Sequence, residues 1–154
     1  MKYTDVLVAF SEVPDEITLC INISNCPHKC KGCHSPYLQK DIGKELNIEE
    51  LEYLIKSNEG ISCVCFMGGK NEELIPLLNK VKEYNLNTGW YTGDSDVPFS
   101  IFYSLDYIKI GPYIEERGSL NNINTNQRFY KIDHNNNSIK ITDITYKFWK
   151  MNYE

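Results

Sequence analysis

The sequence contains no long hydrophobic run and no block of basic residues. No stretch approaches the roughly 20 consecutive apolar residues of a membrane-spanning helix, so we expect no membrane as a partner. The net charge of −5 at pH 7 argues against nucleic acid as a direct partner. The first residues are too acidic, and their apolar run is too short, for a secretory signal. We therefore expect a cytoplasmic protein.

Internal repeats, low-complexity tracts and linkers are also missing, so we expect a single domain over residues 1–154. An apolar content of 42% and a charged content of 24% are ordinary for a soluble globular protein. Six cysteines without a secretory context point to a reducing compartment. Clustered thiols in such a compartment predict a metal-binding or redox site rather than a disulfide framework.

Three of the cysteines lie close together, at Cys26, Cys30 and Cys33, with the spacing C-x₃-C-x₂-C. Thiolates are soft ligands that select iron–sulfur clusters, zinc or copper. Pro27 and Gly32 suit a loop that curls around such a group. A [4Fe–4S] cluster usually takes four cysteine ligands, so three would leave one iron open. An open coordination position is typical of a site for chemistry rather than for structure.

The main alternative is a structural zinc site in a non-enzymatic adaptor, with His28 or His34 as the fourth ligand. Such sites are closed and four-coordinate, and they usually combine two pairs of ligands. The sequence has no second C-x₂-C pair. Cys63 and Cys65 are spaced for one face of a strand, and together with Cys20 they are expected in the core. A thioredoxin-like C-x-x-C would leave Cys26 unexplained.

Short apolar segments alternate with amphipathic helical patterns along most of the chain. The sequence predicts α/β class and a partial, open β/α barrel, because a closed eightfold barrel needs about 250 residues. A C-terminal extension is predicted as a β-hairpin around 133–137, where asparagines favour a turn. We expect strands at 5–10, 17–24, 61–66, 87–91, 106–110, 128–132 and 138–142, helices at 47–57 and 74–84 and over 97–105, and a last helix or strand at 144–151.

Sites in parallel sheets lie at the carboxyl ends of the strands. The cysteine loop follows one expected strand, and Met67-Gly68-Gly69, Tyr91-Thr92-Gly93 and Gly111-Pro112 follow three others. We therefore expect these segments to meet at one rim of the sheet.

The cysteine spacing resembles the cluster motif of the radical S-adenosylmethionine (SAM) superfamily. The longer string CPHKCKGCHSPYL, with the stretches 66–69 and 106–130, resembles the anaerobic ribonucleotide reductase activating proteins, a branch of the glycyl-radical activases. The resemblance implies a [4Fe–4S] cluster on Cys26, Cys30 and Cys33. It also implies that SAM binds the open iron and is cleaved reductively, which generates a glycyl radical on an anaerobic ribonucleoside-triphosphate reductase.

The electron would come from a low-potential donor such as a flavodoxin. The resemblance implies no catalytic side chain beyond the cluster and SAM, but it does imply SAM contacts from Gly32, Cys33, His34, Gly68 and Gly69. The activase of another glycyl-radical enzyme, of the formate-lyase type, is an alternative partner assignment.

One departure from the family pattern concerns an acid. The family has Gly-Gly-Glu where this chain has Gly68-Gly69-Lys70, with acids only at Glu72 and Glu73. The backbone contacts to SAM remain available, whereas no residue is assigned to the acidic contact. Thr92 and Lys109 are further candidates for the same pocket, and a solvated lysine is the alternative for Lys109.

Overall fold

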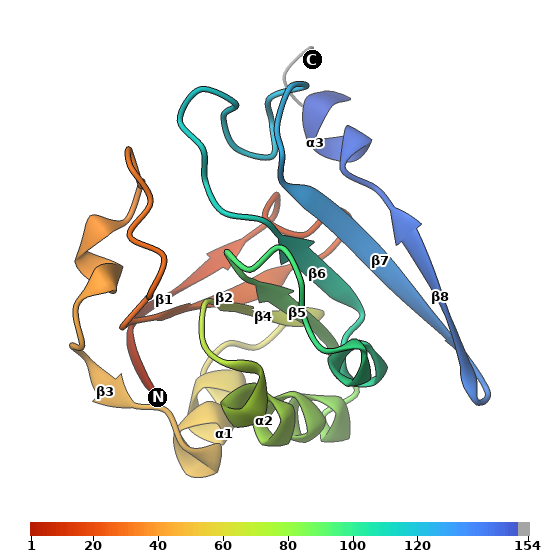
Figure 1. The fold of residues 1–154 in the computed structure, drawn as a ribbon. Helices are drawn as coiled ribbons and strands as arrows, with labels where there is room; N and C mark the ends of the chain where they lie inside the picture. Colours follow the sequence, from red (N-terminus) through yellow and green to blue (C-terminus); the bar gives the residue numbers. More distant parts are fainter. Residues whose placement is uncertain (151–154) are drawn as a thin grey trace.

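The computed structural model describes residues 1–150, which form an open eight-stranded mixed sheet flanked by helices (Figure 1). The strand order is β3-β1-β2-β4-β5-β6-β7-β8, so β3 and β8 are the two edges. The strands are β1 (Lys2–Ala9), β2 (Thr18–Ile23), β3 (Lys44–Glu45), β4 (Cys63–Met67), β5 (Asn87–Tyr91), β6 (Tyr107–Ile110), β7 (Arg128–Asn135) and β8 (Ser138–Asp143). The helices are α1 (Ile48–Lys56), α2 (Asn71–Glu83) and α3 (Tyr146–Lys150), with 3₁₀ turns η1 (Pro36–Gln39) and η2 (Phe99–Ser104).

The four central strands, β2, β4, β5 and β6, are parallel to one another, as the alternation of strands and helices predicts. The remaining strands pair antiparallel on both sides of this core. The first strand runs over Lys2–Ala9 rather than 5–10, because its start pairs with the short edge strand β3. Parallel central strands place their carboxyl ends, and the loops that follow them, on one side of the sheet.

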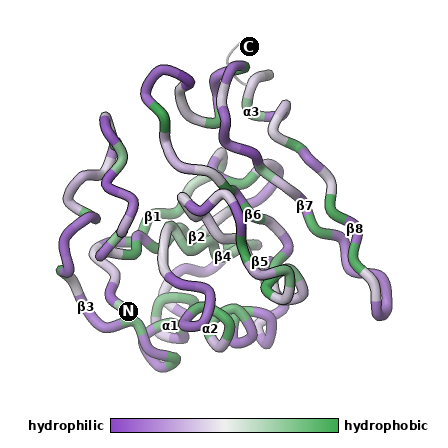
Figure 2. Tube along the Cα trace, in the orientation of Figure 1, coloured by the Kyte–Doolittle hydropathy of each residue, from purple (hydrophilic) through white to green (hydrophobic). Residues whose placement is uncertain are grey.

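Helices α1 and α2 and the turn η2 cover one face of the sheet (Figure 1). Asn47 caps α1 by accepting a hydrogen bond from the Glu50 backbone N–H at 2.8 Å, as its sequence position predicts. Helix α2 begins at Asn71, earlier than its apolar stripe indicates, with Pro76 in its second turn. The hydropathy colouring shows apolar segments on the central strands and on both helices (Figure 2). The largest fully buried side chains of this layer are Trp90 and Phe66.

The opposite face of the sheet is covered by the 10–17 loop, the 111–127 segment and α3. A smaller apolar cluster fills this layer, with Cys63, Cys65 and Phe129 from the sheet and Phe148 from α3. Cys20, Cys63 and Cys65 are all buried, so the prediction that they are core residues is confirmed. Burial raises the pKa of Cys20 to about 12, which keeps its thiol protonated.

The C-terminal hairpin forms as predicted, but its turn is tighter. The strand pairs extend to Asn135 and Ser138, so only Asn136 and Asn137 form the turn, and Asn136 has a φ of 54°. A five-residue loop at 133–137 is therefore wrong. The last element is a helix, and Met151 of the expected 144–151 segment lies outside the described residues. None of the helices within residues 1–150 is long and apolar enough to cross a membrane.

Candidate functional site

The loops after the parallel strands meet around a cavity of about 170 Å³. Its walls include the three loop cysteines after β2, Gly68 after β4, Thr92 and Gly93 after β5, and Lys109 from β6. The sequence-based expectation that these segments share one rim is therefore confirmed for the segments after β2, β4 and β5. The three sulfur-bearing side chains are half-buried, which leaves them accessible from this cavity.

The cysteine loop is a tight curl of backbone. Lys29 and Gly32 have φ values of 47° and 74°, in the left-handed region that reverses the chain direction. The Cys33 N–H donates to the Cys30 carbonyl at 3.2 Å, and the Cys26 N–H donates to the Leu38 carbonyl at 2.9 Å. The Ser35 N–H donates to the Cys33 sulfur at 3.4 Å. The loop thus brings its three cysteines to one cavity, and the sulfur of Cys33 accepts a backbone hydrogen bond.

Three thiols on one loop are a donor set that soft metal centres use. Within residues 1–150, no three His, Cys, Asp or Glu side chains are close enough to hold one metal ion. A structural zinc needs all its sulfurs about 2.3 Å from one point. In a cubane each thiolate binds a different iron, so the three ligands stand farther apart around one cavity. Cys26, Cys30 and Cys33 all line the cysteine cavity, and all three are half-buried.

The two histidines of the zinc alternative have other partners. His28 Nε2 lies 3.1 Å from Asp94 Oδ1, and its imidazole rests against Gly93. The ring of His34 contacts that of Tyr113, with a centroid separation of 5.2 Å. These contacts join the cysteine loop to the loops after β5 and β6. Both histidines thus have other partners, and His28 also lines the cysteine cavity.

Replacing Gly93 by alanine is expected to lower the free energy of unfolding by about 0.5–1 kcal/mol, because the clash is with the end of a half-buried side chain that can rotate away. The added Cβ would lie 2.6 Å from His28 Cδ2, and the contact forces the imidazole away from Asp94. The loss arises from that contact, so Gly93→Ala should be nearly neutral in a His28→Ala background. Urea unfolding of the parent, Gly93→Ala, His28→Ala and the double variant measures the coupling between the two residues. Equal losses in both backgrounds would contradict it.

Gly32 lies against a wall that sequence reasoning did not place in the site. A Cβ on Gly32 would lie 3.2 Å from Glu115 Cδ and 3.3 Å from Tyr113 Cε2. Together with its φ of 74°, this close approach explains the glycine. Tyr113 comes from the stretch 110–118, whose resemblance to the activase branch was the one sequence signal for it. His34 is exposed on the same side of the loop.

The two glycines after β4 differ in whether their backbone N–H and carbonyl groups are already hydrogen-bonded within the chain. Gly68 donates its N–H to the Tyr91 carbonyl at 2.9 Å, and its carbonyl accepts from Trp90 Nε1 at 3.0 Å. In the described part of the chain, the N–H and carbonyl of Gly69 make no such bond. A groove of about 580 Å³ contains both glycines together with Glu72 and Glu73. Gly69 is therefore the better placed of the two for ligand contacts.

Lys109 is a buried, internally bonded lysine rather than a solvated one. Its side chain is 9% exposed, and Nζ donates to the carbonyls of Thr92 at 3.0 Å and Gly111 at 3.1 Å. Burial lowers the pKa of Lys109 to about 8, and the nearby Cys30 and Cys26 oppose the shift. The side chain thus joins the ends of β5 and β6 beside the cysteine cavity.

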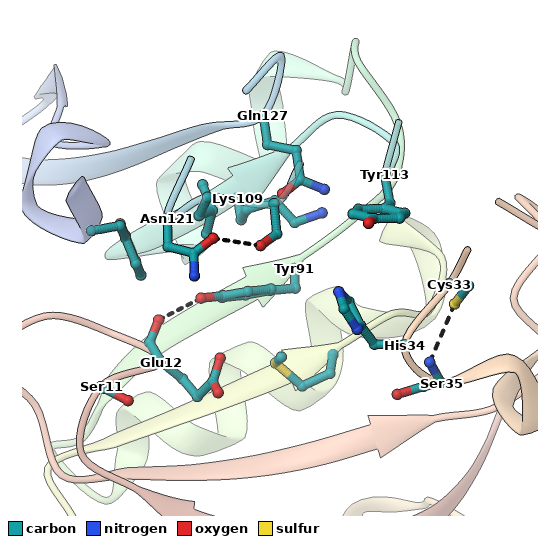
Figure 3. Close-up of a pocket in the computed structure, with 14 residues that line it drawn as sticks. Ser11, Glu12, Cys33, His34, Ser35, Tyr91, Lys109, Tyr113, Asn121 and Gln127 are labelled. Atoms are coloured by element: carbon teal, nitrogen blue, oxygen red, sulfur yellow. Dashed lines mark hydrogen bonds between the residues drawn. The ribbon is translucent and has the colours of Figure 1, made fainter. Parts of the chain in front are cut away.

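A larger pocket of about 640 Å³ adjoins the cysteine cavity on the sheet face that α1 and α2 do not cover. Cys33 and His34 lie at one end and Ser11 and Glu12 at the other, with Tyr91 between them (Figure 3). We call this the inner pocket. The sequence did not predict the end of this pocket formed by Ser11 and Glu12, because the 10–17 loop carries no recognisable motif.

No protein-family model matches this chain, and neither a curated protein nor a solved structure matches it. Any function is therefore inferred from the residues and their geometry.

Proposed function

We propose that this protein is a radical SAM activase that generates a glycyl radical on an anaerobic ribonucleoside-triphosphate reductase. The observation that carries the proposal is the meeting of Cys26, Cys30 and Cys33 on one cavity at the carboxyl end of β2, beside the glycine turns after β4 and β5. The open mixed sheet is compatible with the partial barrel of that superfamily. A reducing cytoplasm suits these half-buried free thiols.

The three cysteines would hold a [4Fe–4S] cluster and leave its fourth iron for SAM. When bound, these cofactors supply the electron transfer and the radical chemistry. The chain positions and shields them. Gly69 offers a free N–H and carbonyl for the amino-acid part of SAM, and Glu72 lies in the same groove, where it can replace the glutamate of the family motif. Gly32, His34 and Tyr113 form the opposite wall.

The inner pocket supports a macromolecular partner. It adjoins the cysteine cavity, and its volume of about 640 Å³ lies within the range of ligand pockets, roughly 300–1,000 Å³. The 10–17 loop, the 111–127 segment and α3 leave this pocket open, so the reductase would complete the enclosure and exclude water. The electron would come from a low-potential donor such as a flavodoxin.

Anaerobic purification and reductive SAM cleavage test the proposal. The protein should be brown, with about four irons and matching acid-labile sulfide per chain, and dithionite should release methionine and 5′-deoxyadenosine from SAM. Mixing with an anaerobic ribonucleotide reductase should give a glycyl radical by electron paramagnetic resonance. A colourless protein with one zinc per chain would refute the activase. A radical that forms only on a formate-lyase-type enzyme would refute the proposed partner.

A further inference from the structure

The loop between β1 and β2 carries three acids, and two of them are satisfied within the chain. Asp15 pairs with Lys147 at 3.1 Å. Glu16 accepts hydrogen bonds from the Ser62 hydroxyl at 2.6 Å and from the Tyr107 hydroxyl at 2.8 Å. Among the side chains of residues 1–149, the carboxylate of Glu12 has neither an ion-pair partner nor a hydrogen-bond partner, although the residue is half-buried. A half-buried charge without a partner is unfavourable, so its position calls for a reason.

Glu12 is held at the inner pocket by its backbone. The Tyr91 hydroxyl donates to the Glu12 carbonyl, and the Glu12 carboxylate then points into the pocket beneath the Tyr91 ring (Figure 3). Much of the surrounding wall is apolar, with Met67, Leu120 and Phe148. Burial raises the pKa of the Cys20 thiol, and the Glu12 charge adds to that shift, which agrees with a carboxylate near the sheet.

Lys109 lines the same pocket, but it does not neutralise Glu12. Lys109 Nζ lies over the Tyr91 ring, 5.7 Å from its centroid, and is bonded to the carbonyls of Thr92 and Gly111. Glu12 lies at the hydroxyl end of the same ring, and no ion pair joins the two side chains. Glu12 is therefore an anionic group that faces an open pocket, and a cation on an incoming ligand would complement it.

We propose that Glu12 recognises a basic side chain, arginine or lysine, on the peptide segment of the partner that carries the target glycine. The inference rests on the proposed function. The glycine would lie at the Cys33 end of the inner pocket and the basic side chain at the Glu12 end (Figure 3). A charge-assisted hydrogen bond in a largely apolar pocket fixes both register and direction of the segment.

The test measures the binding of capped peptides to the full, anaerobically purified chain by isothermal titration calorimetry. Each nonapeptide has a central glycine in an alanine background, with arginine placed at each other position in turn. The matched peptides carry citrulline, which has nearly the same shape and no charge. At one or two positions, arginine should bind at least about tenfold more tightly than citrulline. Glu12→Gln should abolish this preference.

Asp15→Asn is the matched control, because it removes the same charge from the same loop at a residue that is paired with Lys147. It should keep the preference for arginine. Equal affinity for arginine and citrulline, absence of binding by every peptide, or a preference that survives in Glu12→Gln would each overturn the inference. The result is separable from the proposed function: a preference for arginine without iron or SAM cleavage refutes the activase alone, and cleavage without the preference refutes the role of Glu12 alone.

Discussion

Cys30→Ala is expected to lose the brown colour, the bound iron and reductive SAM cleavage, all to background. The proposed cluster has only three protein ligands, so removal of one leaves two thiolates to hold it. The substitution leaves the loop backbone intact, because Cys33 donates to the backbone carbonyl of Cys30 and not to its side chain. Cys30 is half-buried at the surface of the site, and we expect the free energy of unfolding of the metal-free protein to change by less than about 0.5 kcal/mol.

Cys20→Ala provides the matched control for this loss. It removes a thiol from β2, the strand that leads into the cysteine loop, where the side chain is 3% exposed and belongs to the core. The variant should keep iron, colour and SAM cleavage while losing some stability. Iron and sulfide analysis, visible absorption and product chromatography on both variants give the answer. SAM cleavage that persists in Cys30→Ala would show that Cys30 is not a ligand.

Phe66→Ala is expected to lower the free energy of unfolding by about 3–5 kcal/mol, a large part of the total stability of such a domain. Phe66 is fully buried on β4, in the cluster that joins the sheet to helices α1 and α2. Truncation to alanine removes its contacts and leaves a cavity that close-packed neighbours cannot fill. The same strand leads into Gly68 and Gly69, so the change also loosens one wall of the site.

Phe10→Ala makes the same chemical change where the side chain is 72% exposed. Its free energy of unfolding should stay within about 0.5 kcal/mol of the parent value. Anaerobic urea unfolding of both variants, followed by circular dichroism, measures the difference. Similar losses at both positions would contradict the packing described here.

Much of the fold was predictable because its signals are local. The period of apolar residues and the glycines after the strands placed β2, β4, β5 and β6 to within a few residues. The asparagine cap marked the start of α1. The start of β1 was misplaced, because its first residues have little apolar pattern and are ordered by pairing with β3. The hairpin turn was predicted too long, because strand pairing continued into polar residues.

The candidate site also has one part that the local sequence predicted and another that only the tertiary structure showed. The sequence alone predicted its three thiols, because three closely spaced cysteines on one loop are a local property of the chain. Only the tertiary structure decided what surrounds them. Tyr113 reaches the cysteine loop, Lys109 is bonded to two carbonyls at the strand ends, and Glu12 faces the inner pocket from a loop with no motif. These placements depend on which face of the sheet each residue takes and on packing between distant segments, and such contacts leave no periodic trace in the sequence.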